Sequence, residues 1–378
     1  MPLDRREFFR AGAAGAALAL TSPRLFALDT PAVARMKSFT LLNSNENAYG
    51  MPDKVRATAL EALGYGNRYP DREVDDLVDA IAALHKVKRE QVVVGCGSTE
   101  ILRMSADAFA RPVLVMADPT FEAIGQYARV NDSEIVKLPL RSDYAHQLDQ
   151  TPKKPFLSYV CNPNNPTATL TPRKEIEAAI AALPADGYML VDEAYHHFAV
   201  GAPEYSSFLD QPVEHPRVIV ARTFSKIYGM AGIRLGYAVG APETMARLRR
   251  TQLQDNVNMI AALCGLTALE DTAGTQAMAA RIRHDREEFL AQAKKRNLST
   301  LPCYTNFVMM KTGKPVRDLI AYFKAQKIAI GRPFPPMLDH ARISLGTPDE
   351  MKAFWSAWDK MPEKLAEFVG PEPKYRLS

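Results

Sequence analysis

The chain has 378 residues, of which 47% are hydrophobic and 24% are charged, and its formal net charge is +4. This composition excludes an intrinsically disordered chain, and the scattering of basic residues among acidic ones excludes a basic stripe of the kind that binds nucleic acid. Because the length exceeds that of a typical single domain, we expect two domains.

The N-terminus shows the order of features of an export signal. The run Asp4-Arg5-Arg6-Glu7-Phe8-Phe9-Arg10 precedes a short apolar stretch, residues 11–20, that is too brief to span a bilayer. The paired arginines followed by two phenylalanines resemble a twin-arginine signal, which is an address read by a receptor and not a membrane anchor. We therefore predict an export signal at residues 1–34 and a periplasmic mature protein that is not attached to the membrane. The alternative is an N-terminal amphipathic arm on a cytoplasmic protein.

Helical and apolar segments alternate from about residue 54 onward. A helix is predicted at residues 72–85, and buried strands are predicted at residues 91–94, 113–116, 156–160, 189–191 and 218–221. Apolar strands separated by helices predict an α/β fold whose mostly parallel sheet is sandwiched by helices, with ligands at the carboxyl ends of the strands. We assign residues 54–255 to this large domain.

The pattern changes after about residue 255. Helices are predicted at residues 275–296 and 316–326, and strands at residues 306–311, 328–330 and 342–345. This order predicts a smaller α+β domain at residues 256–378. The four cysteines are far apart and show no metal-ligand spacing, so we expect no metal site and four buried free thiols, although a disulfide remains open.

Several polar residues follow the predicted strands. Gly97-Ser98-Thr99 joins a strand to a helix, so free backbone amides at a helix N-terminus and two hydroxyls form a candidate anion cradle. Asn165 lies in the turn Asn162-Pro163-Asn164-Asn165-Pro166-Thr167, which the two prolines hold rigid. Asp192 ends an apolar strand, and Tyr195 lies three residues further on. Each of these motifs alone is also compatible with an ordinary turn, cap or core position.

Lys226 lies after an apolar strand, in the small-residue run Thr223-Phe224-Ser225-Lys226-Ile227-Tyr228-Gly229. A lysine that forms a Schiff base has to reach a cofactor aldehyde without being solvated like a surface ammonium. Ser225 and Arg234 provide a hydroxyl and a fixed cation for a phosphate. An isolated lysine of this kind would be interpreted as a surface residue, but the other motifs favour a catalytic amine.

The run around Lys226 resembles the lysine signature of fold-type I aminotransferases that use pyridoxal 5'-phosphate (PLP). The spacings agree with the class I and II aminotransferase family: 27 residues from Asn165 to Asp192, 34 from there to Lys226, and 8 more to Arg234. The segment that begins with Arg342 is similar to the family segment whose arginine binds the substrate carboxylate. The resemblance spans most of residues 40–350 and implies the fold-type I PLP transferase fold.

The resemblance also implies a role for each of these residues. Lys226 would be the catalytic lysine, and Arg342 would bind the substrate. The remaining positions would bind the cofactor: Gly97, Ser98, Thr99, Phe121 as the ring that stacks on it, Asn165, Asp192 at its ring nitrogen, Tyr195 at its phenolic oxygen, Ser225 and Arg234. The family usually has Gly at the position of Ala168, which leaves open whether the backbone there has a positive φ.

Within this family, the chain most resembles the histidinol-phosphate aminotransferase subfamily. Asn43-Ser44-Asn45-Glu46-Asn47 is similar to its early Asn-Glu-Asn segment, which implies that Asn47 binds the substrate and that residues 35–53 form an arm or part of the small domain. Asn67-Arg68-Tyr69-Pro70 is similar to the segment whose tyrosine reaches the cofactor of the neighbouring subunit, so Tyr69 implies a homodimer. The stretch Pro333-Phe334-Pro335-Pro336 departs from the subfamily pattern.

The sequence therefore predicts a transaminase that moves an amino group between an amino acid, or histidinol phosphate, and a 2-oxo acid by a ping-pong mechanism. One alternative is another fold-type I PLP reaction, such as that of a decarboxylase, lyase or cyclase. A second alternative is a non-catalytic exported binding protein. Histidine synthesis is cytoplasmic, so the subfamily resemblance and the export signal disagree: either the substrate differs from histidinol phosphate or the N-terminus is not an export signal.

Overall fold

The computed structural model describes residues 38–150, 156–210 and 215–365. The predicted export signal at residues 1–34 lies outside the described residues. The chain divides into two compact units, Met1–Thr40 and Leu41–Ser378. The boundary that we predict near residue 255, inside this second unit, stays a prediction.

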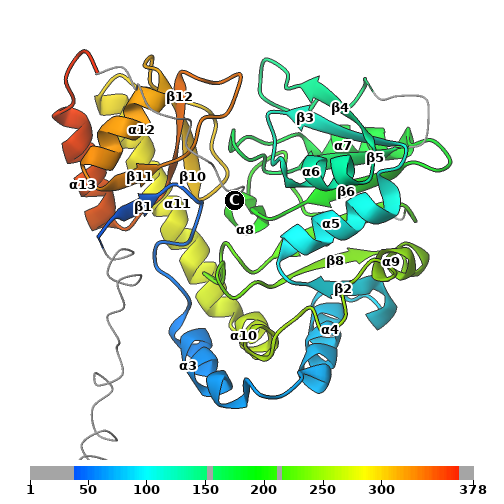
Figure 1. Ribbon diagram of the computed structural model, residues 1–378. Helices are drawn as coiled ribbons and strands as arrows, with labels where there is room; N and C mark the ends of the chain where they lie inside the picture. Colours follow the sequence, from blue (N-terminus) through cyan, green and yellow to red (C-terminus); the bar gives the residue numbers. More distant parts are fainter. Residues whose placement is uncertain (1–37, 151–155, 211–214, 366–378) are drawn as a thin grey trace, which may run out of the picture. The chain divides into compact units, whose positions relative to one another are not determined.

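The second unit contains a seven-stranded sheet with the strand order β2-β8-β7-β6-β5-β3-β4 (Figure 1). Its strands are β2 (Val92–Gly95), β3 (Val113–Asp118), β4 (Glu134–Pro139), β5 (Leu157–Cys161), β6 (Tyr188–Asp192), β7 (Val218–Thr223) and β8 (Gly236–Gly240). Strands β7, β6, β5, β3 and β4 are parallel to one another, and β8 is antiparallel to both β7 and β2. The prediction of a mostly parallel sheet is confirmed.

Strands β4 and β8 were not predicted. In β4, Glu134 and Lys137 interrupt the apolar residues, as is common in an edge strand with one solvated side. Strand β8 has a glycine at each end, and glycine is unfavourable in strands. Both strands are stabilised by pairing, β4 with β3 and β8 with β7 and β2, and local patterns do not reveal such pairing.

Apolar residues on both faces of this sheet explain why helices cover it on both sides. In β6, Met189 and Val191 belong to one hydrophobic core and Leu190 belongs to another, because successive side chains of a strand point to opposite faces. The first core includes residues of α4 (Asp71–His85), α7 (Arg173–Ala181), α8 (His196–Ala199) and α10 (Met259–Glu270). The second core includes residues of α5 (Ser98–Phe109), α6 (Ala123–Val130) and α9 (Pro242–Arg249). This arrangement is the predicted sandwich.

The described chain beyond α10 contains three helices and short strands in smaller sheets. Strands β12 (His340–Ser344), β10 (Phe307–Lys311) and β9 (Ser299–Thr300) form an antiparallel sheet, and β11 (Ile328–Ile330) pairs with β1 (Thr40–Leu42). The helices are α11 (Thr272–Lys295), α12 (Val316–Ala325) and α13 (Pro348–Asp359). Phe307, Phe323 and Phe354 belong to the same hydrophobic core as Val191 of β6, so the core is continuous from the large sheet into this part.

Three further elements precede the large sheet along the chain. They are the helix α3 (Asp53–Ala62) and the 3-10 helices η1 (Leu63–Tyr65) and η2 (Arg89–Gln91). Among the described helices, none combines the length and the apolar character needed to cross a bilayer.

All four cysteines are free, which agrees with the predicted free thiols. Cys161 and Cys264 are buried, but Cys96 is exposed and Cys303 is only partly buried. The prediction of four buried thiols is therefore wrong for Cys96, because this residue lies in the solvent-facing turn between β2 and α5. The part of the chain that the structure describes contains no group of acidic, His and Cys residues that could hold a metal ion.

Candidate active site

A cavity of about 420 Å³ lies where several strands of the large sheet end at their carboxyl side. This volume is typical of small-molecule sites, which range from ~300 to 1,000 Å³. Ten of the predicted site residues line the cavity: Ser98, Thr99, Phe121, Asn165, Asp192, Tyr195, Ser225, Lys226, Arg234 and Arg342. Gly97, Asn47 and Tyr69 do not line it. Motifs that are far apart in sequence thus meet in one place.

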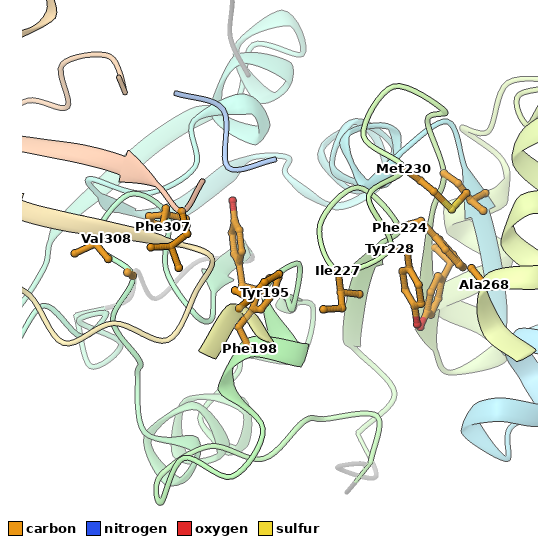
Figure 2. Close-up of a cluster of buried hydrophobic side chains, with 14 of the residues drawn as sticks. Tyr195, Phe198, Phe224, Ile227, Tyr228, Met230, Ala268, Phe307 and Val308 are labelled. Carbon is orange, nitrogen blue, oxygen red and sulfur yellow. The ribbon is translucent and has the colours of Figure 1, made fainter. Parts of the chain in front are cut away.

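The loop that carries Lys226 is held by buried apolar residues on both sides of the lysine. Phe224, Ile227, Tyr228 and Met230 are all buried, and Figure 2 shows the rings of Phe224 and Tyr228 beside each other near Ala268. Lys226 itself is only partly buried, and its Nζ lies 3.5 Å from the Ser44 carbonyl oxygen. The apolar anchors therefore hold the loop while the amine stays free to face the cavity.

The pKa of Lys226 is lowered to about 8, first by burial and then by the nearby positive charge of Arg342. An ordinary lysine has a pKa near 10.5 and is almost entirely protonated at neutral pH. The lower pKa increases the fraction of neutral amine, which is the form that attacks a carbonyl carbon.

Asp192 lies at the carboxyl end of β6 with both carboxylate oxygens hydrogen-bonded. Its Oδ2 accepts a hydrogen bond of 2.9 Å from the Tyr159 hydroxyl, and its Oδ1 accepts one of 3.0 Å from the Ala194 amide. Burial nevertheless raises the pKa of Asp192 to about 6. A buried carboxylate is costly unless a cation is close, so this position suits a protonated ring nitrogen.

Tyr195 stands beside Phe307, and Figure 2 shows its hydroxyl directed away from Phe198. This hydroxyl accepts a hydrogen bond of 3.0 Å from Asn45 Nδ2, so its own proton remains available to a ligand in the cavity. Burial raises the pKa of Tyr195, which keeps the phenol protonated. No local sequence pattern identifies this role of Asn45, because its partner is 150 positions away.

Arg342 and Asn165 are hydrogen-bonded to each other inside the cavity. Arg342 Nη1 donates to Asn165 Oδ1 at 2.7 Å, and its Nη2 donates to the Asn43 carbonyl oxygen at 2.7 Å. The bond from Arg342 occupies the carbonyl oxygen of the Asn165 side chain, so the amide NH₂ is the group that would donate to a ligand. The Nε of Arg342 is buried and has no hydrogen-bond partner among the described residues. An orphaned guanidinium N–H of this kind suits a bound anion.

The predicted anion cradle is formed by the start of α5 and by Arg234. Gly97 precedes this helix with a φ of +76° and a ψ of 162°, a conformation that is essentially restricted to glycine. A Cβ at Gly97 would also collide with the guanidinium of Arg234. Gly97 does not line the cavity. Because it has no Cβ, it allows the Arg234 guanidinium to approach the N-terminus of α5.

Ser225 is oriented toward the same cradle by Thr223. The Thr223 hydroxyl donates to Ser225 Oγ at 2.9 Å and accepts from the Ser225 backbone amide at 3.1 Å. The Ser225 hydroxyl proton is therefore free to donate to an anion.

Ala168 adopts a positive φ of +67°. Its amide donates to the Asn164 carbonyl oxygen at 2.8 Å, its carbonyl oxygen accepts from the Tyr304 amide at 2.9 Å, and the residue is fully buried. The surrounding hydrogen bonds impose the turn, and the small side chain of alanine tolerates the strain.

Asn47 does not line the cavity, and its contact with the substrate stays a prediction. Its Nδ2 donates to the Ile227 carbonyl oxygen at 2.9 Å and its Oδ1 accepts from the Tyr49 amide, so the side chain is used within the protein. The neighbouring Asn45 and Glu46 line the cavity instead. Asn45 has a φ of 54°, which turns the chain so that the side chain of Asn45, and not that of Asn47, reaches Tyr195.

The arrangement of donors and acceptors fits PLP. The cavity brings together an amine, a buried carboxylate, two donors for a phenolic oxygen and a cradle for a phosphate. A Cβ would close the cradle at Gly97, and Arg342 places a guanidinium at the cavity wall. The site therefore has the chemistry for a bound aldehyde cofactor and an acidic substrate.

Comparisons with known proteins agree with this geometry. Residues 37–357 match the family model "Aminotransferase class I and II". The chain is 32% identical over 323 residues to histidinol-phosphate aminotransferase of Symbiobacterium thermophilum, covering 84% of this chain and 88% of the relative. It is also 32% identical over 341 residues to histidinol-phosphate aminotransferase 2 of Methylococcus capsulatus, covering 86% of this chain and 91% of the relative.

A solved structure shares the fold. The crystal structure of histidinol-phosphate aminotransferase from Sinorhizobium meliloti in complex with pyridoxal-5'-phosphate matches with a TM-score of 0.78 and 24% identity, covering 89% of this chain and 95% of that chain. At this identity the likeness establishes the fold alone.

Proposed function

The chain belongs to the aminotransferase class I and II family and is a PLP-dependent transaminase, and we propose that the residues of the cavity described above carry out its reaction. The observation that supports this most strongly is the meeting of the Lys226 amine, the Asp192 carboxylate and the Arg342 guanidinium in one cavity. These three groups match the three requirements of amino transfer: an amine for the aldehyde, an acid for the ring nitrogen and a cation for the substrate carboxylate.

When bound, PLP supplies an electron sink for the negative charge that develops at the substrate carbon. Asp192 would keep the ring nitrogen protonated, and Tyr195 and Asn165 would donate hydrogen bonds to the phenolic oxygen. Ser98, Thr99, Ser225 and Arg234 would hold the phosphate.

Phe121 lines the cavity and would stack on the ring. Lys226 Nζ would bind the aldehyde carbon and, once the substrate amine has displaced it, would carry a proton between the substrate and the cofactor. Arg342, which lines the cavity, would orient the substrate by its carboxylate.

We propose an amino acid or histidinol phosphate as amino donor and a 2-oxo acid as acceptor. A screen of the purified holoenzyme with histidinol phosphate, aromatic amino acids, glutamate and glutamine tests this. Mixing the holoenzyme with an amino donor in the absence of an acceptor should release one equivalent of oxo product per site, measured by mass spectrometry.

Carbon dioxide release in place of an oxo product would favour a decarboxylase. A protein that binds PLP but converts no donor would be a binding protein.

We propose that the protein is exported by the twin-arginine route, which carries folded proteins and is therefore compatible with loading of the cofactor before transport. The support is the order of features in residues 1–34 of the sequence. The measurement is the location and the N-terminal sequence of the mature protein, compared with a variant in which Arg5 and Arg6 are both replaced by Lys. Equal export of both forms would contradict the proposal.

We propose that the protein is a homodimer in which Tyr69 reaches the cofactor phosphate of the neighbouring subunit. Tyr69 is 76% exposed and lies away from its own cavity. Leu60, Leu63 and Tyr65 are also exposed, so several large apolar side chains lie on the surface within ten residues of the chain. A concentration of exposed apolar residues is typical of a protein interface.

A further inference from the structure

A buried ion pair lies at the carboxyl ends of β6 and β7. Arg222 Nε donates to Glu193 Oε2 at 2.8 Å, and the two side chains are 7% and 1% exposed. In the chain, Glu193 directly follows Asp192. Arg222 directly precedes Thr223, and both Asp192 and Thr223 line the cavity. The ion pair itself does not line the cavity, but each of its members is the next residue in the chain to one that does.

The ion pair and Asp192 lie on opposite faces of the large sheet. Val220 of β7 belongs to the first hydrophobic core, and Ala221 belongs to the second. Because successive side chains of a strand point to opposite faces, Arg222 projects toward the first core. The Glu193 amide donates to the Ala221 carbonyl oxygen at 2.9 Å, which extends the pairing of β6 and β7 by one residue. The ion pair therefore joins the two strands from the face opposite to that of Asp192.

Both oxygens of the Glu193 carboxylate have hydrogen-bond partners. Oε2 also accepts from the Ser207 hydroxyl at 2.7 Å, and Oε1 accepts from the Phe208 amide at 2.7 Å. Arg222 Nη2 donates to the same Ser207 Oγ at 2.6 Å. Burial opposes the charged form of Arg222, yet its pKa is raised, because the carboxylate of Glu193 is close. A buried ion pair with complete hydrogen bonding favours one geometry, and loss of one partner leaves an uncompensated charge.

The ion pair is coupled to the cavity by charge and by the backbone. Burial is the main cause of the raised pKa of Asp192, and the negative charge of Glu193 raises it further. On the neighbouring strand, Arg222 is four residues before Lys226, so a displacement of this strand end would move the loop that carries the amine. Both groups that contact the cofactor in the proposed reaction thus depend on this pair.

We propose that Glu193 and Arg222 are positioning residues for the reaction. Their ion pair holds Asp192 and Lys226 in their relative positions from the opposite face of the sheet, and it keeps the charge behind Asp192 balanced. This inference rests on the proposed function, because it takes Asp192 and Lys226 to contact the cofactor. The pair itself contacts neither cofactor nor substrate and acts through these two residues.

The surroundings of the ion pair allow its charge to be tested. Burial lowers the pKa of the histidines and raises the pKa of the tyrosines within electrostatic reach of Arg222, which are His85, His196, His197, Tyr205, Tyr228 and Tyr237. These side chains therefore stay neutral between pH 5 and pH 9. Further charged side chains there are Asp210, which is 58% exposed, and Arg173. The titratable groups that face Asp192 itself are Tyr159, Cys161, Tyr195 and Lys226.

Glu193→Gln tests the charge, because it keeps the shape of the side chain and leaves Arg222 unbalanced. The pKa of Asp192 should fall by about 0.5 pH unit or more. Carbon-13 NMR of the apo protein with labelled aspartate measures this pKa, and Asp192→Asn assigns the signal. The acidic limb of the kcat/KM profile of the PLP-loaded enzyme should move in the same direction.

The double variant Glu193→Gln/Arg222→Met tests the geometry. It removes both charges and the hydrogen bond between the strands, so the pKa of Asp192 should return at least halfway to its native value. PLP should bind about tenfold more weakly, because Asp192 and Lys226 are no longer held in their relative positions. Glu193→Gln alone keeps a hydrogen bond from Arg222, so its PLP affinity should change less than about threefold. Fluorescence titration measures both affinities.

Glu175→Gln is the matched control. It makes the same chemical change in another ion pair, in which Arg141 Nη1 lies 2.6 Å from Glu175 Oε2, and neither of these residues lines the cavity. The pKa of Asp192 and the PLP affinity should both stay native. Circular dichroism and thermal unfolding show whether each variant is folded. The double variant leaves no unpaired charge in the interior, so it tests the proposal even where Glu193→Gln does not fold.

Three outcomes would each show that the ion pair only stabilises the fold. They are an unchanged pKa of Asp192 in folded Glu193→Gln, a native PLP affinity in the double variant, and equal effects in Glu175→Gln. A failure of the proposed aminotransferase function would look different. In that case no amino donor would yield an oxo product, yet the pKa of Asp192 in the apo protein and the affinity for PLP would still report on the ion pair.

Discussion

The hydroxyl of Tyr159 lies 2.9 Å from Oδ2 of Asp192, and both residues are buried. Strands β5 and β6 are parallel and pair Tyr159 with Leu190 and Cys161 with Asp192, so the tyrosine lies on the neighbouring strand two residues before the position opposite the carboxylate. The hydrogen bond stabilises the ionised carboxylate, and therefore lowers its pKa, against the effect of burial, which raises it. Tyr159 thus helps to keep Asp192 charged for the ring nitrogen.

Replacing Tyr159 with Phe should raise the pKa of Asp192 above its present value of about 6, because one stabilising hydrogen bond is removed. One such bond is worth about 1 kcal/mol, so we expect the acidic limb of the kcat/KM profile to move upward by about 0.5–1 pH unit. Steady-state rates between pH 5 and pH 9 measure this. Tyr188→Phe, at the other end of β6, is the control, and an equal shift in both variants would contradict the role of Tyr159.

Lys226→Ala should lower turnover by about 10³-fold or more while the protein stays folded, because the variant lacks the amine that binds the aldehyde and moves the proton. Borohydride reduction of the native holoenzyme should fix PLP on Lys226, detected by peptide mass spectrometry. Lys137→Ala is the control, since this lysine pairs with Asp118 outside the cavity. Multiple turnovers at the native rate in Lys226→Ala would refute the assignment.

The rate at which the apo protein captures PLP should rise with pH and level off above about pH 8. The pKa of Lys226 is lowered to about 8, and the neutral amine, which is the reactive form, becomes dominant above that pH. Below it the rate should fall about tenfold per pH unit. Stopped-flow absorbance measures the rate. A rate that keeps rising through pH 10 would show that the amine has an ordinary lysine pKa.

Gly97→Ala should destabilise the protein by about 1–3 kcal/mol, because its backbone conformation is suited to glycine alone. The new Cβ should also displace the Arg234 guanidinium and weaken PLP binding by about tenfold or more. Chemical unfolding and fluorescence titration measure the two effects. Gly232→Ala is a matched control on the same side of the site, since a Cβ there meets nothing within 4 Å. Similar losses in both variants would contradict the cradle.

The protein should lose stability as the pH falls below about 6.5. Burial lowers the pKa of His85 and His146 to about 4 and that of His197 to about 3, against an unfolded value of 6.5. Between these values the unfolded chain binds more protons than the folded one, so the free energy of unfolding decreases with falling pH. Each histidine contributes a slope of about 1.4 kcal/mol per pH unit within that window.

Urea unfolding of His146→Gln at pH 7, 6 and 5 measures this effect. The variant should show a smaller pH dependence than the native protein, by about 1.4 kcal/mol per pH unit. His284→Gln is the control, because this side chain is exposed. A slope that is unchanged in His146→Gln, or equally reduced in both variants, would show that burial of His146 is not its origin.

Tyr69→Phe should weaken PLP binding about tenfold to a hundredfold if the hydroxyl of one subunit binds the phosphate in the other, since hydrogen bonds to charged groups are worth about 1.5–3 kcal/mol. Fluorescence titration of PLP measures the affinity, and sedimentation measures the mass. Tyr65→Phe, four residues earlier and also exposed, is the control. A monomer at all concentrations, or an unchanged affinity in Tyr69→Phe, would contradict the dimeric site.

The sequence by itself determined the α/β fold and most of the site. Lys226, Asp192 and Asn165 each follow an apolar strand, and strands of this kind end at one edge of a parallel sheet, so their proximity could be predicted from local patterns. The spacing between these motifs agrees with that of the aminotransferase family, and this agreement indicated the chemical role of each residue. These positions are predictable because each depends on its own strand and on the turn that follows.

Only the tertiary structure decided which side chains complete the site. Asn45, and not Asn47, faces Tyr195, because one left-handed residue turns the arm, and Ser344, which is 299 positions away, binds its backbone amide. The contact of Tyr159 with Asp192 depends on the pairing register of two strands, and the ion pair of Glu122 with Arg332 joins segments 210 positions apart. Such contacts arise from packing between distant segments, and no local periodicity or spacing records them.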